Sequence, residues 1–66
     1  MEYTNSQIDH LIAEHIHNAD DRKMLSLRLI DGMTFEQIGF EMSMTNKTVR
    51  LRIHKGDQIL FKHLPG

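Results

Sequence analysis

Apolar residues in this chain recur every three or four positions, which is the spacing of residues on one face of a helix. No alternation of period two lasts more than a few residues, and β-branched residues are sparse, so the pattern predicts no strands. Four segments carry the helical period, over about residues 5–17, 21–31, 35–42 and 46–63. The sequence therefore predicts an all-α fold of four helices.

Residues that cap helices precede each of these segments. Thr4 and Thr34 are each followed three residues later by Gln, which is the spacing of a capping box. Asp20 and Thr45 are the caps that we expect for the second and fourth helices. Apolar pairs at the spacing of a hydrophobic staple flank the three Thr caps, and these pairs are Tyr3 with Ile8, Met33 with Ile38, and Met44 with Val49.

The predicted helix ends carry signals of their own. Asn18 and Gly32 can take the left-handed backbone conformation that ends a helix, and Pro65 with Gly66 follows the last helix. The second helix is apolar nearly all round, so we expect it at the centre of the fold. The candidate core residues are Ile8, Leu11, Ile12, Ile16, Met24, Leu25, Leu27, Leu29, Ile30, Phe35, Ile38, Met42, Val49, Ile53, Gly56, Leu60 and Leu64.

The size and composition of the chain limit what it can do. Its 66 residues, of which 39% are apolar, allow one domain over residues 1–66 and leave little room for a catalytic cleft. No catalytic arrangement is recognisable, so we expect no enzymatic activity, no cofactor and no small-molecule substrate. The lack of Cys, of a long apolar run and of a signal-peptide pattern at the start predicts a cytoplasmic protein outside the membrane. So small a core also favours very regular helix packing, self-association or a stabilising partner.

Charge is distributed unevenly along the chain. Residues 1–42 carry eight acidic and three basic residues, a net charge of −5, whereas residues 43–66 carry five basic and one acidic residue, a net charge of +4. The overall net charge of −1 therefore hides a basic C-terminal end. Such asymmetry indicates a surface for an anionic partner.

The segment over about residues 34–63 has the pattern of a helix-turn-helix unit. The dipeptide Ser43-Met44 separates a short helix from a longer one that begins with polar and basic residues, and Gly39 stands where steeply crossing helices require a small residue. Opposite the apolar stripe, the longer helix presents Lys47, Arg50, Leu51, His54, Gln58 and Phe61, with Asn46 and Thr48 beside its start. In a major groove such side chains can reach base edges, while Arg52 and Lys55 can reach phosphates.

Residues 20–62 resemble region 4 of bacterial sigma factors, the domain that reads promoter DNA, particularly in the extracytoplasmic-function type. Leu27-Arg28 followed by residues 31–39 is similar to that family's LR…GxTxEEIG line, and residues 48–56 are similar to its TVRxRIxRA recognition helix. Ser43 departs from the family pattern by replacing the usual Gly of the turn, and Gly56 by replacing the usual Ala. The sequence contains no counterpart of region 2, the part of a sigma factor that melts promoter DNA. The layout is therefore similar to that of small stand-alone sigma-like regulators of phage and mobile elements.

The resemblance implies a sequence-specific DNA-binding regulator of transcription, whose fourth helix lies in the major groove of double-stranded DNA. The expected DNA contacts are Asn46, Lys47, Thr48, Arg50, Leu51, Arg52, His54 and Lys55. Sigma region 4 domains also grip the RNA polymerase β-flap, so polymerase is a second implied partner. Two other functions stay open: an anti-sigma or co-sigma factor that binds polymerase without DNA contact, and a packaging-type DNA binder that multimerises.

The histidines invite a metal-site hypothesis. His10, Glu14 and His17 share one face of the first predicted helix. Because this face lies opposite the apolar stripe, a site there would be open and unsupported, and we expect surface residues and no metal. His15 falls on the inward face, where we expect a hydrogen-bonded core histidine.

Two Phe residues lie off the main apolar stripes of their helices. Phe40 either packs against the first or second helix or forms an exposed apolar patch for self-association or for RNA polymerase. Together with Phe61 and Leu64 it is the apolar surface that we expect to be most available for a homodimer. A two-fold dimer would read DNA half-sites about 10 base pairs apart, or a multiple of that spacing.

Overall fold

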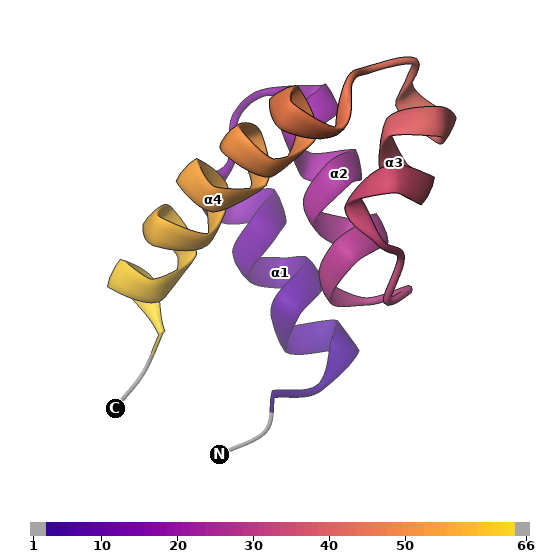
Figure 1. The fold of residues 1–66 in the computed structure, drawn as a ribbon. Coiled ribbons are helices and arrows are strands. Elements are labelled where there is room, and N and C mark those ends of the chain that lie inside the picture. Colours follow the sequence, from indigo (N-terminus) through magenta and orange to yellow (C-terminus); the bar gives the residue numbers. More distant parts are fainter. Residues whose placement is uncertain (1–2, 65–66) are drawn as a thin grey trace.

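A computed structural model describes residues 3–64 of the chain, and all regular structure in this range is helical (Figure 1). Its helices are α1 (Asn5–His15), α2 (Ala19–Leu29), α3 (Phe35–Met42) and α4 (Asn46–His63). The predicted all-α class and the predicted spans of the last two helices are confirmed. Pro65 and Gly66, the predicted stop signal of the fourth helix, lie outside the described residues.

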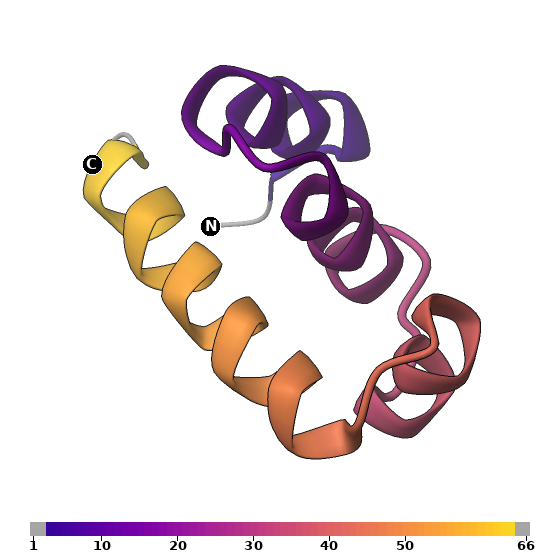
Figure 2. The same cartoon turned by 90° about the horizontal axis from the view of Figure 1, so that it is seen from above.

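The helices α2 and α4 form the centre of the molecule. Each of them packs against all three other helices, whereas α1 and α3 do not contact each other. Seen from above, α4 runs along one side, α1 and α2 lie opposite it, and α3 lies beside the start of α4 (Figure 2). The expected central position of the second helix is therefore confirmed, and α4 shares it.

One hydrophobic core joins the four helices. Its buried side chains are Ile12, Ile16, Met24, Leu25, Ile38, Val49, Ile53 and Leu60, and every one of these was a candidate core residue. Leu29 departs from the prediction because it is exposed at the end of α2. With Tyr3 and Leu64, from the two ends of the described chain, Leu29 lines an apolar cavity of about 310 Å³. No helix among residues 3–64 is long and apolar enough to cross a membrane.

Local side-chain caps start three of the helices as the sequence predicts. Thr4 and Thr34 each form a complete capping box, with Gln7 and Gln37 as the reciprocal partners. Thr45 caps α4 by accepting a hydrogen bond from the backbone N–H of Thr48 at 3.2 Å. These bonds satisfy backbone donors that a helix leaves unpaired in its first turn.

The junction between α1 and α2 differs from the prediction. The first helix ends at His15 rather than at residue 17, and the second occupies Ala19–Leu29 rather than 21–31. Asn18 does not adopt the left-handed conformation, because its side chain caps α2 by accepting hydrogen bonds from the N–H groups of Asp20 and Asp21 (2.9 and 3.1 Å). Asp20, the expected cap, therefore lies inside the first turn of α2. A carboxylate is favourable there because it faces the positive end of the helix dipole.

Candidate nucleic-acid interface

The turn between α3 and α4 is held by bonds within its own backbone. Ser43 adopts the left-handed conformation (φ 56°, ψ 43°), as does Gly32 (φ 72°) in the loop before α3, where the sequence predicts it. The N–H of Met44 donates to the carbonyl oxygen of Gly39 at 2.8 Å, which closes the turn. Ser43 thus reaches, at some conformational cost, the backbone geometry that Gly adopts freely.

Gly39 is required by the backbone of this turn. A Cβ atom at Gly39 would lie 2.7 Å from the carbonyl oxygen of Met44, which is too close for two non-bonded atoms. The predicted need for a small residue is confirmed, but the crowding comes from the turn before α4. Val49 is buried and Met44 packs against the core, so the turn also holds the start of α4 in place.

The face of α4 opposite the core is exposed, as the sequence predicts. Its residues Lys47, Arg50, Leu51, His54, Gln58 and Phe61 are all exposed. The first four of them line a groove of about 390 Å³, which we call the α4 groove and which is completed by Phe35, Ile53 and Asp57. The structure therefore brings Lys47, Arg50, Leu51 and His54 together on one concave surface between α3 and α4.

The other expected DNA contacts lie around this groove rather than in it. Asn46 is exposed at the first position of α4. Thr48 is exposed, and its hydroxyl oxygen accepts a hydrogen bond from the hydroxyl of Thr45 at 2.9 Å. Lys55 is exposed but belongs to a different groove, on the side of α4 that faces the α1–α2 junction.

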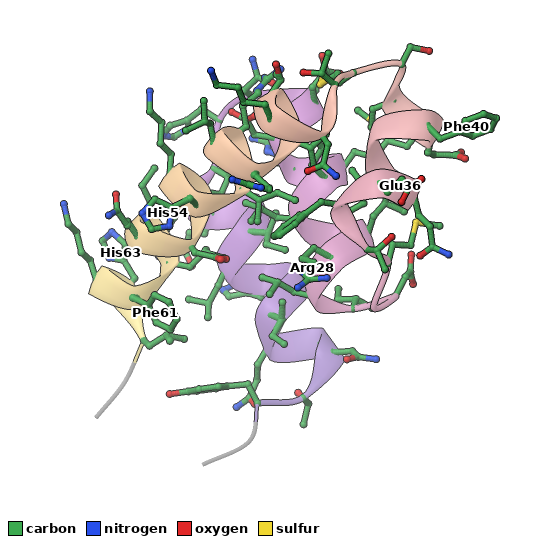
Figure 3. All side chains as sticks on the ribbon, in the orientation of Figure 1. Arg28, Glu36, Phe40, His54, Phe61 and His63 are labelled. Carbon is green, nitrogen blue, oxygen red and sulfur yellow. The ribbon has the colours of Figure 1, made fainter. Side chains whose placement is uncertain are left out.

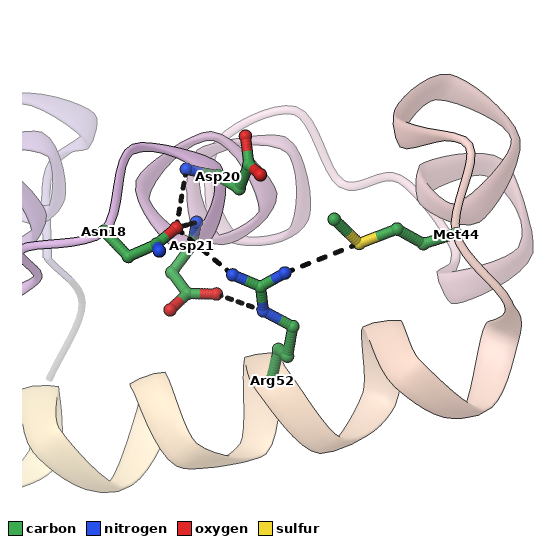
Figure 4. Close-up of polar contacts among 5 residues, drawn as sticks. All are labelled: Asn18, Asp20, Asp21, Met44 and Arg52. Carbon is green, nitrogen blue, oxygen red and sulfur yellow. Dashed lines mark hydrogen bonds and ion pairs between the residues drawn. The ribbon is translucent and has the colours of Figure 1, made fainter.

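Arg52 points to the interior side of α4 and clamps the start of α2 (Figure 4). Its Nε donates to Oδ1 of Asp21 at 2.7 Å and its Nη2 donates to Oδ1 of Asn18 at 3.1 Å. Its Nη1 lies 3.8 Å from the sulfur of Met44. The side chains of Arg52 and Asp21 are each only 29% exposed. In this geometry the guanidinium of Arg52 is engaged within the chain, which differs from the expectation that it reaches a phosphate.

Asp57 is the acidic member of the α4 groove. Partial burial raises the pKa of its carboxyl above the ordinary value of 3.8, while the nearby positive charges of His54 and Arg28 act in the opposite direction. Arg28 itself stacks over the ring of Phe35, with 4.5 Å from Cζ to the ring centroid, and donates to the carbonyl of Met33 at 2.9 Å. The guanidinium of Arg28, from α2, therefore packs against a ring that lines the α4 groove.

His10 and His17 are exposed as expected, whereas the shared helix face of His17 and the expected role of His15 are not confirmed. His10 pairs with Glu14 at 3.0 Å on the exposed face of α1, but His17 lies beyond the end of this helix. Among residues 3–64, no group of three His, Asp or Glu side chains could hold a metal ion. His15 is half-buried and stacks on His63, with the ring centroids 3.7 Å apart and the planes nearly parallel. The expected hydrogen-bonded core histidine is thus a ring-stacking residue that joins α1 to α4.

Phe40 and Phe61 do not form one surface. Phe40 is 89% exposed, so the interpretation that it packs against the first or second helix is wrong. Phe61 is 70% exposed near the end of α4, far along the molecule from the outer side of α3 (Figure 3). Each Phe must therefore be considered as the centre of a separate patch.

Comparison with known proteins does not place this chain in a family. No protein-family model matches the sequence, and the searches of curated proteins and of solved structures found no significant match. Its function is therefore inferred from the geometry of the chain and from the motifs in its sequence.

Proposed function

We propose that this chain is a sequence-specific DNA-binding regulator of transcription that inserts α4 into the major groove of double-stranded DNA. One observation carries the proposal: Lys47, Arg50, Leu51 and His54 line a single exposed groove at the start of a helix held by a tight turn. The resemblance of residues 20–62 to sigma region 4 supports the same function.

The side chains of this surface suit different contacts with DNA. Arg50 and Lys47 can donate hydrogen bonds to guanine O6 and N7, and the exposed Leu51 can contact a thymine methyl group. Asn46 at the start of α4 can donate to and accept from adenine. Lys55, on another side of the helix, suits a phosphate contact, which strengthens binding without reading sequence.

A second contact, with RNA polymerase, extends the proposal. The resemblance to sigma region 4 implies docking on the polymerase β-flap, and the exposure of Phe40 favours some protein contact. The alternative function is a co-sigma or anti-sigma factor that binds polymerase without touching DNA. Binding of DNA by the isolated chain distinguishes these functions.

The decisive experiment selects binding sites from random oligonucleotides with the purified protein. We expect one enriched motif, and Arg50→Ala should cost about 1–3 kcal/mol on that motif and relax preference at one or two base positions. Lys55→Ala should weaken binding to all sequences alike. It should also lower the salt slope, which is the steepness of log affinity against log salt concentration, by about one. The matched control is Lys62→Ala, which removes an exposed charge at the far end of α4. Failure to enrich any motif, together with capture of purified polymerase, would overturn the proposal in favour of the alternative.

A further inference from the structure

The outer side of α3 carries an exposed aromatic ring between two carboxylates. Phe40 is the most exposed of the large apolar side chains, and Glu36 and Glu41 beside it are exposed as well. These three residues line one shallow depression on α3, and we call them the acidic α3 face. Figure 3 shows Phe40 pointing away from the other helices.

The chain cannot cover this face by itself. Ile38 and Gly39 are buried on the other side of α3, which is the side that packs against α2 and α4. At 100° per residue, Phe40 falls opposite that buried side, with one Glu on each flank. The acidic α3 face is therefore open to an occupant from outside the chain.

The α4 groove has the complementary chemistry. Against the single carboxylate of Asp57 it offers two cations, Lys47 and Arg50, beside the exposed aliphatic side chain of Leu51. The acidic α3 face offers two anions beside a phenyl ring, and α3 contains no basic residue. An aromatic side chain that enters an apolar site with opposite charges around it is a common arrangement at the centre of protein interfaces.

We propose that the acidic α3 face docks into the α4 groove of a second copy of this chain. Phe40 of one copy packs against Leu51 of the other, and Glu36 and Glu41 pair with Lys47 and Arg50. The two surfaces are different, so the contact is head-to-tail: a copy that has docked its α3 face still presents a free groove, and a copy whose groove is occupied still presents a free α3 face. The proposal uses the groove assigned above to DNA but does not depend on DNA as its ligand.

This contact has a regulatory consequence. It covers Lys47, Arg50 and Leu51, which are the residues proposed to read DNA, so DNA and a second copy compete for the same groove. Because the attraction is largely electrostatic, salt weakens it. Self-association thus covers the DNA-reading groove of every copy except the one at the end of each assembly.

The first test is analytical ultracentrifugation of the full chain without DNA. At about 0.01 M ionic strength, where the Debye length is about 30 Å, we expect the mean mass to rise with protein concentration. At about 1 M, where the Debye length is about 3 Å, we expect a monomer. A monomer at every concentration in low salt would overturn the proposal.

The second test uses two variants that each lose one of the two surfaces. The triple variant Glu36→Gln/Phe40→Ser/Glu41→Gln loses the acidic α3 face, and Lys47→Gln/Arg50→Gln loses the cations of the α4 groove. All five positions are exposed, so both variants should fold, which circular dichroism checks. We expect each variant alone to associate at least about tenfold more weakly than the wild type. Mixed, they should form a complex of one copy each that cannot grow, because each supplies the surface that the other lacks.

Controls separate this contact from other modes of association. Asp9→Asn/Asp31→Asn removes two exposed carboxylates from elsewhere and should leave the association unchanged. Phe61→Ser removes the other exposed Phe side chain and should also have no effect. Association that is lost with Phe61→Ser and kept in the triple variant would overturn the proposal.

DNA binding by the triple variant distinguishes this proposal from the proposed function. The triple variant keeps the α4 groove, so it should bind the selected DNA site at least as tightly as the wild type. If it self-associates less and also binds DNA, both proposals stand. If it self-associates less and neither protein binds DNA, only the proposed function fails.

Discussion

The α3–α4 turn and the α1–α2 junction both connect two helices in three residues. They differ in how far apart along the sequence the residues that support them lie. The turn is held by its own backbone, in which Met44 donates to Gly39 and Ser43 takes the left-handed conformation. The junction has local capping bonds from Asp20 and Asp21 to Asn18, but it is also held from α4, because Arg52 binds Asn18 and Asp21 and because His63 stacks on His15. The two regions therefore differ in how they should respond to mutation. Changes in the turn should move α4 directly, whereas changes at the junction should act through contacts between distant residues.

Gly39→Ala should cause the largest loss of stability. The new Cβ meets a backbone oxygen at 2.7 Å, so the turn itself must open. We expect a loss of about 2–4 kcal/mol in the free energy of unfolding, measured by urea denaturation. Ala13→Gly, on the exposed surface of α1, is a control that changes the same two residue types in the opposite sense. A loss no larger than the control's would show that the turn is not rigid.

Gly56→Ala tests the packing of α4 against Leu25 of α2. Helix propensity alone favours a gain of about 0.5–1 kcal/mol, because Gly56 lies inside a helix. The new Cβ, however, would lie 2.6 Å from Cδ1 and 3.1 Å from Cγ of the fully buried Leu25. We expect crowding to outweigh propensity and to lower stability by about 1–2 kcal/mol. A raised melting temperature would mean that Leu25 can move aside.

Arg52→Ala should loosen the α1–α2 junction while leaving the turn in place. The paired side chains are partly buried, so we expect a loss of about 1 kcal/mol. A double-mutant cycle with Asp21→Ala should show a coupling energy of similar size. Lys55→Ala, one turn along the same helix and exposed, should change stability little. The salt slope of DNA binding supplies a second measurement: a fall of about one in Arg52→Ala would assign a phosphate contact to this residue.

Ser43→Gly should stabilise the turn slightly. A residue other than Gly is disfavoured at φ 56°, and relief of this cost should outweigh the greater freedom of Gly in the unfolded chain. We expect a gain of about 0.5–1 kcal/mol, with no change in the coupling between Arg52 and Asp21. Lower stability would indicate that the Ser43 side chain makes a contact that supports the turn.

Asp57→Asn should produce the smallest effect, and this effect should depend on pH. Burial raises the pKa of Asp57 in the folded chain, so its charged form costs stability at neutral pH. This cost declines as the pH falls through the raised pKa and is absent below 3.8. The variant should therefore melt slightly higher than the wild type at neutral pH and at the same temperature in acid. A lower melting temperature at neutral pH would show that attraction to Arg28 and His54 outweighs burial.

The same contrast between near and distant contacts explains which features could be predicted from the sequence. Thr34, Gln37 and Thr45 lie next to the helix starts that they mark, so the bounds of α3 and α4 follow from local pattern. The bounds at the α1–α2 junction were wrong by two residues. The sequence predicts a helix end at Asn18, whereas Asn18 caps α2 and accepts a hydrogen bond from a residue 34 positions away.

The candidate site divides in the same way. The helical period alone placed Lys47, Arg50, Leu51 and His54 on one exposed face, and the structure confirms that placement. The helical period could not show that Arg52 turns toward Asp21, because that contact joins residues 31 positions apart. The helical period also indicates that Phe40 is exposed, since it places Phe40 opposite Ile38 and Gly39. The general preference of Phe for a core obscured it.

Tyr3 and Leu64 line the same apolar cavity, so the two ends of the described chain lie close together. The described chain begins and ends on the same side of the molecule (Figure 1). Circular permutation exploits such proximity: a short linker from α4 back to α1, with new ends opened near Gly32, would keep every pair of packed helices. The architecture also suits grafting into a loop of a larger host protein. One connection would leave from the start of α1 and the other from the end of α4, on the side of the molecule away from Lys47 and Arg50.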